Sequence, residues 1–349
     1  MQSTYSKNDV TLLLKDITGM VQPLETKQRE HLIQKGTHYC EMLPSEYRPS
    51  EKYIDTYQTS LESYAKPTAK AVCQVSEKIY MLKGKNAVIV SLARAGIPIG
   101  ILIKHYLDKK YNICVPHYSI SIIRGRGIDT NAIDYILARH KGKNIQFVDG
   151  WIGKGAIQNE LREAIKAYPQ INADLAVLAD PANITDLCGT HEDILIPSSC
   201  LNCTVSGLIS RTFLRDDIIS PSDFHGAAFY PQFTTEDVSY QFIKTIENHF
   251  DFSTKATDMS RGELGITEVK NIASHFGITD INFVKPGIGE ATRVLLRRVP
   301  WKLLVAQNCQ NDPLLKHILR LAVEKNVPTE IYPLQNYKVC GIIKNMADV

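Results

Sequence analysis

Hydrophobic residues follow two different periods along the chain, and the change of period divides it into regions. Over residues 1–82 apolar residues recur mostly every three or four positions, most clearly at residues 26–44 and 50–82. This spacing gathers apolar side chains on one face of a helix. We therefore predict an N-terminal helical arm over residues 1–82.

Between residues 86 and 197 the pattern changes to short, nearly continuous apolar runs. These runs lie at residues 87–93, 113–123, 145–149, 175–180 and 193–197, and amphipathic segments of helical length separate most of them. Apolar strands that alternate with helices indicate a parallel sheet covered on both faces. The predicted fold class is therefore α/β. In such sheets a ligand site lies beyond the carboxyl ends of the strands.

A polar stretch at residues 249–263 separates this region from a tail with its own alternation of helices and strands. The tail pattern predicts helix 266–276, strand 281–284, helix 289–298, strand 302–306, helix 313–325 and strand 329–332. We expect two domains: residues 1–255, including the helical extension 1–82, and a small α/β/α domain at residues 261–349.

Composition agrees with a globular protein that has a sizeable core. Of 349 residues, 44% are hydrophobic and 22% are charged. The sequence lacks the run of roughly 20 apolar residues that a membrane helix needs. It also begins without a basic and apolar secretory signal. Eight irregularly spaced cysteines are typical of reduced thiols. We expect a cytoplasmic protein without a membrane partner.

Charge is distributed unevenly between the two predicted domains. Residues 261–349 contain 12 Lys and Arg against 8 Asp and Glu, whereas the preceding residues are nearly neutral. A basic domain favours an anionic partner such as nucleic acid. Chance variation is the alternative.

The segment 144–168 combines a strand, a glycine-bearing turn and the start of an amphipathic helix. Glycines allow the backbone to approach a ligand closely, and the free N–H groups at a helix N-terminus attract anions. An acidic side chain at the strand end can accept hydrogen bonds from sugar hydroxyls. We predict a ribose-phosphate site, with an ordinary strand–helix turn as the alternative. Its residues are Asp149, Gly150, Gly153, Lys154, Gly155 and Ala156.

A second loop follows the strand at residues 87–93. Ser91, Arg94, Ala95 and Gly96 lie at its end, and the Arg94 guanidinium offers a planar fork that suits pyrophosphate. We expect the two loops to form one split ligand site.

Together the two loops resemble the type I phosphoribosyltransferase family. The resemblance implies binding of phosphoribosyl pyrophosphate with Mg²⁺, and transfer of its ribosyl group to an acceptor that the sequence does not identify. It also implies that Arg124 and Arg126, at the place of the family's mobile loop, close over the pyrophosphate. Together with Asp149 and Arg94, these two arginines would be the catalytic residues. A solvated basic hairpin is the alternative for these two arginines. The family usually has two acids at the strand end, whereas Gly150 follows Asp149 here.

A small polar segment at residues 196–214 contains two cysteines. In the transferase interpretation it lines the acceptor pocket with Ser198, Ser199, Cys200, Asn202 and Thr204. In a competing interpretation Cys200 and His225 form a thiolate–imidazole pair, in which the histidine activates the thiol as a nucleophile. Cys200 and Cys203 form a single C-x-x-C without a second pair, so we expect no metal site there.

Five separated segments occur in one order, namely HYCEMLP (38–44), SLARAGIPIG (91–100), FVDGWIGKG (147–155), SSCLNCTVSGLISRT (198–212) and FHGAAFYP (224–231). They resemble a bacterial family of tellurite-resistance and stress operons, described as phosphoribosyltransferase-like and also labelled StiP-type cysteine protease. We interpret the chain as a phosphoribosyltransferase acting in stress response. A cysteine protease using Cys200 and His225, and a non-catalytic nucleotide or RNA sensor, stay open. So does a homo-oligomer.

The tail at residues 284–332 resembles the Pelota-type RNA-binding domain. The resemblance implies that Gly287, Gly289, Glu290, Thr292 and Arg293 meet RNA at a glycine turn and helix start. It also implies that Lys285, Arg293 and Arg297 neutralise phosphates. The alternative is a retained fold that docks on the first domain or on another protein.

Overall fold

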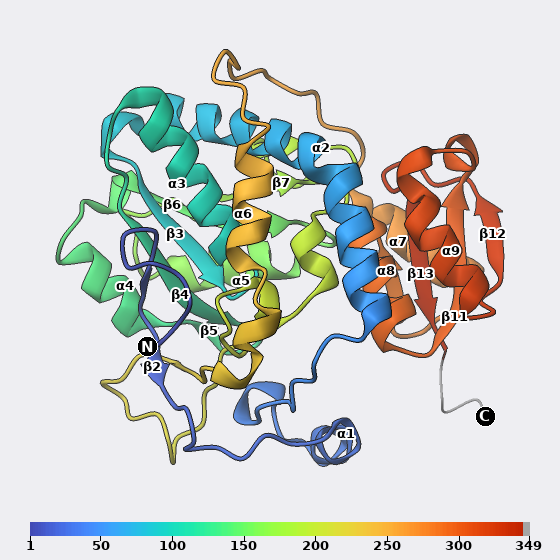
Figure 1. Cartoon of the computed structure of the whole chain (residues 1–349), viewed down its shortest axis with the longest axis horizontal. Helices are drawn as coiled ribbons and strands as arrows, with labels where there is room; N and C mark the ends of the chain where they lie inside the picture. The colour runs from blue at the N-terminus through green and yellow to red at the C-terminus, as the bar shows by residue number, and fades with distance from the viewer. Residues whose placement is uncertain (345–349) are drawn as a thin grey trace.

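The computed structural model describes residues 1–344, apart from the side chains of residues 26, 27, 30 and 297. Its first part is a sheet with helices on both faces, and its second part is a smaller unit beside it (Figure 1). The elements of the first part are β1 (Thr11–Leu12), β2 (Lys15–Asp16), α1 (Thr26–Gln34), α2 (Glu51–Lys83), β3 (Val88–Ala93), α3 (Ile97–Tyr111), β4 (His117–Ile123), β5 (Gly127–Ile128), α4 (Thr130–Leu137), β6 (Ile145–Trp151), α5 (Ala156–Ile165), β7 (Leu175–Ala179), β8 (Cys188–Thr190), β9 (Gly226–Ala227) and α6 (Ser239–Glu247). Within the described residues no helix is long and apolar enough to cross a membrane.

The main sheet has the strand order β1-β4-β3-β6-β7-β8, with β5 paired to β4. Neighbouring strands along this order run parallel. Helices α2, α3 and α6 share one hydrophobic core with one face of the sheet, while α4 and α5 contribute to the core on the other face. Coverage on both faces explains why β3 and β7 are almost entirely apolar.

The predicted mixed α/β fold with a parallel sheet is confirmed, with two local differences. The N-terminal arm is not all helix, because β1 pairs with β4 and β2 pairs with β9. The apolar run at residues 193–197 forms no strand, and the last strand of the sheet is β8. Ile194, Leu195 and Ile196 are buried in the core as a connecting segment instead. A short apolar run indicates burial but does not by itself distinguish a strand from a buried loop.

The second part is built on a four-stranded sheet of order β10-β13-β11-β12. Its elements are α7 (Gly265–His275), β10 (Val284–Pro286), α8 (Ile288–Arg297), β11 (Pro300–Ala306), α9 (Lys316–Glu324), β12 (Thr329–Tyr332) and β13 (Val339–Ile343). Strand β13 was not expected from the sequence, yet it lies between β10 and β11 and pairs antiparallel with both. The unit is therefore an α/β domain whose central strand comes last.

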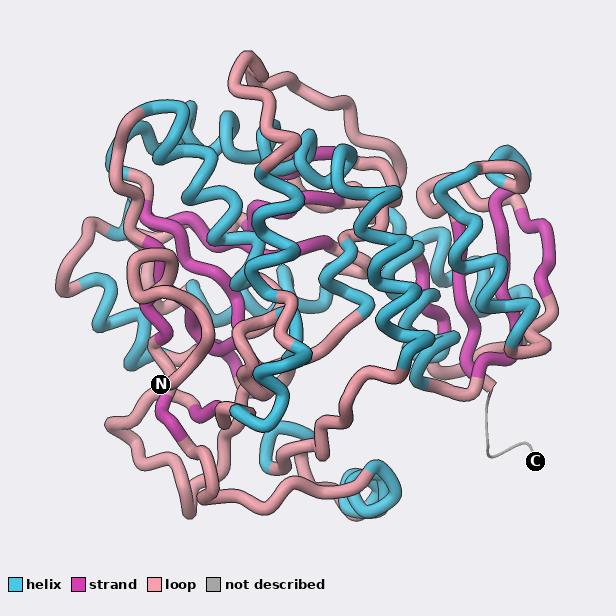
Figure 2. Tube along the Cα trace, in the orientation of Figure 1, coloured by secondary structure: helices cyan, strands magenta, loops and turns pink. Residues whose placement is uncertain are grey.

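Helix α2 belongs to both parts of the molecule (Figure 2). It packs on β7 and β8 of the first sheet, and its Tyr64 hydroxyl donates a 2.7 Å hydrogen bond to the Leu314 carbonyl of the second part. One hydrophobic cluster runs from α2 and α3 into α7, α8 and α9 without a break. The two predicted domains are thus packed together through a shared core.

A single buried carboxylate also joins the parts. The side chain of Asp193 accepts hydrogen bonds from the backbone N–H of Ile288 at 2.9 Å and of Lys338 at 2.9 Å. Ile288 is the first residue of α8, so the carboxylate caps this helix with a favourable charge. Gly287 precedes it at φ 88°, a conformation that glycine adopts readily. Burial raises the pKa of Asp193 to about 6, and these N–H bonds oppose the rise.

We predict that Asp193→Ala destabilises the docking of the second part on the first. The substitution leaves two buried N–H groups without an acceptor, which costs about 2–4 kcal/mol in free energy of unfolding. Hydrogen exchange of the first turn of α8 should become faster, and thermal unfolding should begin earlier. Glu192→Ala is the matched control, because Glu192 is an exposed neighbour. Equal protection of α8 in both variants would contradict the role of Asp193.

Candidate functional site

A cavity of about 830 Å³ opens at the carboxyl ends of β3 and β6. The chain leaves β3 for β4 on one side, while β6 pairs with β3 on the other, so this is the point where the strand order reverses. Ligands bind at such a point in open α/β sheets. Helix α8 of the second part and the segment before α2 supply the remaining walls. The place predicted for a ligand site is therefore a real cavity.

Asp149 lies in the cavity wall at the end of β6. Its Oδ1 accepts a 2.8 Å hydrogen bond from the N–H of Gly150. Burial nevertheless raises the pKa of Asp149 to about 7. A single carboxylate that is half protonated at neutral pH is a weak ligand for Mg²⁺, which prefers ionised oxygens. The Mg²⁺ expected with phosphoribosyl pyrophosphate stays a prediction.

Some residues of the second predicted loop line the cavity, and others lie deeper in the protein. Arg94 and Ala95 line the cavity. The Arg94 guanidinium is held by the Glu46 carboxylate at 2.9 Å and by the Ile209 carbonyl at 2.8 Å. Burial lowers the pKa of Arg94, and the Glu46 charge more than offsets this, so the net shift is upward. Ser91 lies deeper and is bonded to His117 Nε2 at 2.8 Å.

Gly96 belongs to the same loop and serves close packing. A side-chain carbon at this position would lie 2.8 Å from the Leu92 carbonyl oxygen, so only glycine fits between β3 and α3.

The glycine turn after β6 is covered by the second part of the molecule. The Tyr337 hydroxyl donates to the Gly153 carbonyl at 2.8 Å. Lys154 Nζ donates to the carbonyls of Ile281 and Val284 at 3.1 and 3.0 Å. Burial lowers the pKa of Lys154 to about 8. Gly155, at φ 85°, and Ala156 open α5. In this conformation the turn is an interdomain contact, and its predicted phosphate contacts stay untested.

Arg124 and Arg126, the predicted mobile-loop arginines, face the N-terminal segment. The backbone N–H of Arg124 donates to the Tyr39 hydroxyl at 3.0 Å, and its guanidinium reaches Asn282 of the second part at 3.5 Å. Arg126 forms an ion pair with Glu41 at 2.7 Å. Neither is among the residues that line the cavity.

Some of the residues predicted to line the acceptor pocket line the cavity, and others do not. Asn202 and Thr204 line the cavity together with Cys203. Ser198 and Ser199 lie outside that lining, in the short helix Pro197–Cys200. Ser199 packs against α8, since its Oγ would lie 3.6 Å from a side-chain carbon placed on Gly289.

Cys200 and His225 bond to different parts of the molecule. The Cys200 thiol is fully buried and lies 3.8 Å from the Ser60 hydroxyl of α2. His225 bonds through Nδ1 to the Ser121 hydroxyl at 2.9 Å, and its backbone N–H donates to Asp129. Burial lowers the pKa of His225. The pairing of Cys200 with His225 stays a prediction.

The residues predicted to meet RNA are turned towards the first part. Lys285, Glu290 and Arg293 line the cavity, with Lys285 and Glu290 3.7 Å apart as an ion pair. Thr292 is fully buried and bonds to His317 at 3.3 Å. The side chain of Arg297 lies outside the described residues. Docking on the first part, the alternative drawn from the sequence, is therefore what this helix does here.

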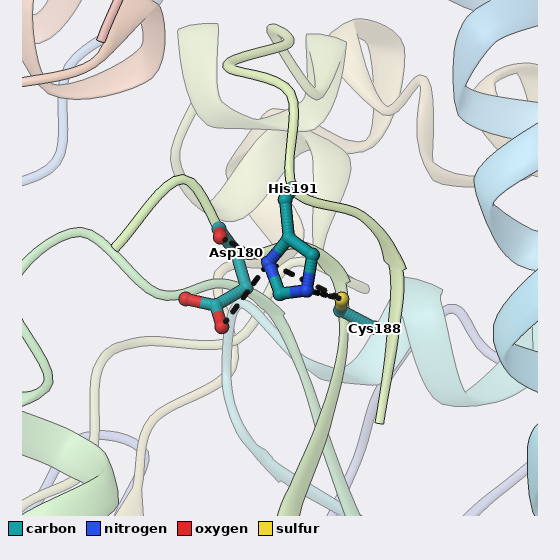
Figure 3. Close-up of side chains that lie close together, drawn as sticks. All are labelled: Asp180, Cys188 and His191. Atoms are coloured by element: carbon teal, nitrogen blue, oxygen red, sulfur yellow. Dashed lines mark hydrogen bonds and ion pairs between the residues drawn. The ribbon is translucent and has the colours of Figure 1, made fainter. Parts of the chain in front are cut away.

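Sequence reasoning missed a cluster of Cys188, His191 and Asp180 (Figure 3). The Cys188 sulfur lies 3.5 Å from His191 Nε2 and 3.7 Å from Nδ1 of the same ring. His191 Nδ1 lies 2.9 Å from the Asp180 carbonyl and 3.7 Å from its Oδ2. Because a carbonyl only accepts, Nδ1 carries the proton, and Nε2 of the neutral ring is left to accept from the thiol. This is the arrangement of a nucleophile, a base and a group that orients the base.

The Asp180 carboxylate is fixed by the backbone around it. Its Oδ2 accepts from the N–H groups of Ile184 and Thr185 at 2.6 and 2.7 Å. Burial raises the pKa of Asp180 to about 6, so it is mostly ionised at pH 7. Burial also raises the pKa of the Cys188 thiol to about 12, which keeps the sulfur protonated in this conformation.

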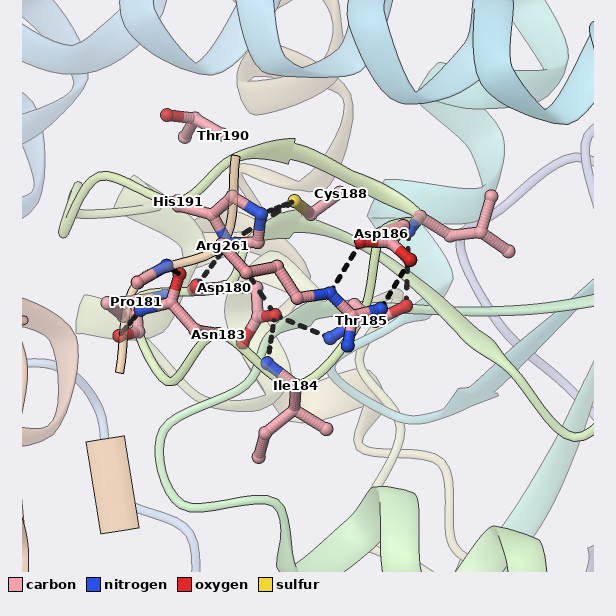
Figure 4. A network of polar contacts seen from close by, with 12 residues as sticks. Asp180, Pro181, Asn183, Ile184, Thr185, Asp186, Cys188, Thr190, His191 and Arg261 are labelled. Carbon is pink, nitrogen blue, oxygen red and sulfur yellow. Dashed lines mark hydrogen bonds and ion pairs between the residues drawn. The ribbon is translucent and has the colours of Figure 1, made fainter. Parts of the chain in front are cut away.

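A cleft of about 1000 Å³ borders the cluster on the side of His191. Its walls come from four regions: Asn183, residues 190–193, the linker 258–263 and the second part of the chain. Arg261 of the linker lies close to the cluster, where it forms an ion pair with Asp186 (Figure 4). The cluster therefore lies at the meeting point of both parts.

The three side chains could also hold a metal ion, because their ligand atoms all lie within 4.8 Å of one another. Three protein ligands with an open fourth position suit zinc. The spacing Cys188-x-x-His191 directly after Asp180 at a strand end was the available sequence signal. It was passed over because the last strand of the sheet was expected at residues 193–197.

A second thiol–imidazole contact joins His38 and Cys40, whose Nδ1 and Sγ lie 2.9 Å apart. The same Nδ1 also accepts from the Cys40 backbone N–H at 3.4 Å. Burial raises the pKa of Cys40. In the described residues the His38 ring is hydrogen-bonded to Cys40 alone, so this pair lacks the orienting group that His191 has in the Asp180 carbonyl.

Comparison with known proteins gives two matches along the chain. Residues 3–247 match the family described as "Tellurite-like stress resistance cysteine protease StiP", and residues 263–345 match the "PELOTA RNA binding domain". A relative from Acinetobacter baylyi (strain ATCC 33305 / BD413 / ADP1) is named "Cysteine protease StiP". It is 34% identical over 347 residues, which cover 91% of this chain and 88% of the relative.

These matches correct the interpretation reached from the sequence. The prediction of phosphoribosyl transfer as the main function is wrong, because both the family and the relative are described as cysteine proteases. The transferase and glycosyltransferase classes are wrong for the same reason. The two loops suggested a transferase site by their likeness to another enzyme class, and such likeness does not establish the chemistry of a site. With a family match over residues 3–247 and a full-length relative, the chain belongs to the StiP family of tellurite-like stress resistance cysteine proteases.

Proposed function

We propose that this chain hydrolyses peptide bonds, with Cys188 as nucleophile, His191 as general base and Asp180 as the group that orients the base. The observation that carries the proposal is the 3.5 Å approach of His191 Nε2 to the Cys188 sulfur, with Nδ1 bonded to the Asp180 carbonyl. The descriptions of the family and of the relative support the hydrolase class.

The chemistry follows from the protonation states of the cluster. Because burial holds the pKa of Cys188 at about 12, the thiol is neutral at pH 7 and must lose its proton as it attacks. His191 Nε2 takes that proton while the sulfur bonds to the carbonyl carbon, and the imidazolium then donates it to the leaving amine. Water hydrolyses the thioester and regenerates the thiol. The Asp180 carboxylate, 3.7 Å from Nδ1, stabilises the imidazolium.

The cleft beside His191 supplies the approach for a peptide. Its volume of about 1000 Å³ lies at the upper end of small-ligand pockets. Polar side chains that can bond a peptide backbone line it, among them Asn183, Gln335 and Asn336.

Two other cysteines are competing nucleophiles. Cys40 has a close imidazole in His38, and Cys200 was the choice from the sequence, paired with His225. We favour Cys188 because its thiol lies close to the ring of His191 and this ring is also hydrogen-bonded to Asp180, whereas the His225 ring is bonded to the Ser121 hydroxyl.

We further propose that the second part of the chain contacts RNA. The match of residues 263–345 to the PELOTA RNA binding domain supports this proposal. In the docked conformation Lys285, Glu290 and Arg293 face the cavity, so an RNA strand on that face must compete with the first part of the molecule.

The nucleophile can be assigned by comparing single alanine variants of Cys188, Cys40 and Cys200. We expect Cys188→Ala to lower the hydrolysis of fluorescently labelled casein by roughly 10³-fold or more, because a covalent nucleophile is lost. The other two variants should keep most of the activity. Circular dichroism of each variant separates a chemical loss from unfolding.

Cys114→Ala is the matched control, because Cys114 is an exposed cysteine outside the cluster. Full activity in folded Cys188→Ala, or its loss in Cys40→Ala or Cys200→Ala alone, would overturn the assignment.

The Asp180 carboxyl should produce a pH-dependent difference between wild type and Asp180→Asn. At pH 7–8 the variant should be slower by roughly 10- to 100-fold, since the imidazolium loses a nearby negative charge. Below pH 6 the two rates should converge, because the wild-type carboxyl, with its pKa of about 6, is then protonated too.

The stability of the folded protein changes with pH in the opposite direction to the rate, so the two effects of Asp180 can be distinguished. The folded pKa of Asp180 lies above the ordinary value, so protonation favours the folded state as pH falls from about 6 towards 4. A rate ratio that does not change with pH would argue against the role of Asp180.

RNA binding should increase when the docked face is released. We expect full-length Asp193→Ala to bind a single-stranded oligoribonucleotide more tightly than wild type, because α8 loses its buried cap and its cationic face becomes accessible. Fluorescence anisotropy at two salt concentrations measures this, and added phosphate contacts should steepen the salt dependence. Unchanged affinity, or tighter binding by wild type, would count against this face.

A further inference from the structure

The cavity of about 830 Å³ takes no part in the proposed hydrolysis. The Cys188 cluster borders a different hollow, whose lining shares no residue with this cavity. Both parts of the molecule build its walls: Arg94 and Asp149 come from the first sheet, and Arg293 comes from α8. A volume of this size holds a ligand of nucleotide dimensions.

Positive charge dominates the lining. Among the described residues, seven cationic side chains and three carboxylic acids face the cavity. Glu46 is paired with Arg94, and Glu290 is paired with Lys285. The third acid, Asp149, is half protonated at neutral pH. Arg48 is paired with Glu236 outside the lining, and the excess of positive charge rests on Arg29, Arg211 and Arg293.

Two of these arginines, Arg211 and Arg29, have guanidinium N–H groups that the described part of the protein leaves without an acceptor. The Nε of each is buried and has no hydrogen-bond acceptor among the described residues. Arg211 Nη2 does bond the Tyr39 carbonyl, and its guanidinium lies 4.8 Å from the Tyr39 ring centre. Burial lowers the pKa of Arg211 to about 10, and the like charges of Arg29 and Arg94 add to the shift. A buried charged donor without an acceptor is costly.

A third unsatisfied group lies in the same wall. Thr204 is 2% exposed, lines the cavity, and its hydroxyl has no partner in the part of the chain that the structure describes. In the chain as described, two guanidinium Nε–H groups and one hydroxyl thus lie buried without acceptors in residues that line one hollow. An anion with several oxygens held in the hollow would offset the charge of these guanidinium groups.

We propose that this cavity is a binding site for a phosphate monoester, with Arg29, Arg211 and Arg293 as its phosphate-binding residues. Guanidinium groups bind phosphate oxygens through two parallel hydrogen bonds, whereas a carboxylate would use fewer of the donors present. Thr204 adds a neutral donor. Arg293 belongs to the second part, so a bound phosphate links the two parts of the chain.

A free mononucleotide and the phosphorylated end of an RNA strand share this chemistry. The mononucleotide needs only the cavity, whereas the RNA end would also place its chain along the second part. Both are tested with the full-length protein, so that the interdomain walls are intact.

The test is isothermal titration of the full chain with adenosine 5′-monophosphate, and with a short oligoribonucleotide carrying either a 3′-phosphate or a 3′-hydroxyl. We expect binding of the mononucleotide that weakens by about tenfold or more in Arg211→Gln and in Arg293→Gln, because each removes a charge-assisted contact. Tighter binding of the 3′-phosphorylated strand than of the 3′-hydroxyl strand would identify an RNA end as the ligand.

The controls make the result independent of folding and of hydrolysis. Arg293 is exposed, so we expect Arg293→Gln to fold. This variant keeps the test valid even where the buried substitution Arg211→Gln unfolds the protein. Arg162→Gln removes an exposed arginine of α5 and should not change binding. Cys188→Ala should bind as wild type does, so failure of the hydrolase assignment does not affect this test. Absence of binding by every probe, or binding unchanged in both Arg211→Gln and Arg293→Gln, overturns the proposal.

Discussion

The contact on which both candidate sites depend is the capping of α8 by the buried carboxylate of Asp193. It joins a loop of the first sheet to the first turn of a helix in the second part. The helix then lies against the cavity on one side, and the Asp193 segment lines the cleft beside His191 on the other. Because this carboxylate is held at a helix N-terminus, its charge is stabilised where burial alone would disfavour it. The geometry of two separate hollows is thus set by one interdomain interaction.

Hydrophobic periodicity predicted the architecture better than it predicted the chemistry. The runs at residues 87–93, 145–149 and 175–180 became β3, β6 and β7, since strands buried on both faces must be apolar. The apolar run at 193–197 is buried as a loop and not as a strand. The sequence therefore predicted the last strand of the sheet at the wrong place. Cys188 and His191 were overlooked as a result, because they were not placed beside Asp180.

The site chemistry depends on contacts that no local pattern contains. A turn with three glycines predicted open N–H groups, yet Lys154 and Gly153 contact residues more than 120 positions later. Asp193, more than 90 positions before Ile288, has the same long-range character. Likeness of loops to another enzyme class suggested a transferase, while the arrangement that fits a protease is three residues brought together by the end of β7, β8 and the turn after it. The long-range contacts of Gly153, Lys154 and Asp193 follow from the whole fold and are not encoded in local spacing.

The position of β13 has a consequence for how the protein is made. This strand follows every other strand of its sheet in the chain, yet it lies between β10 and β11. During synthesis the ribosome must release β13 before either neighbour can complete its hydrogen bonds, and Lys338 and Tyr337 just before it also supply contacts to the first part. The first part can begin to fold earlier, as N-terminal units do. The cavity and the cleft, whose walls include residues of the second part, are therefore completed only once β13 has joined its sheet.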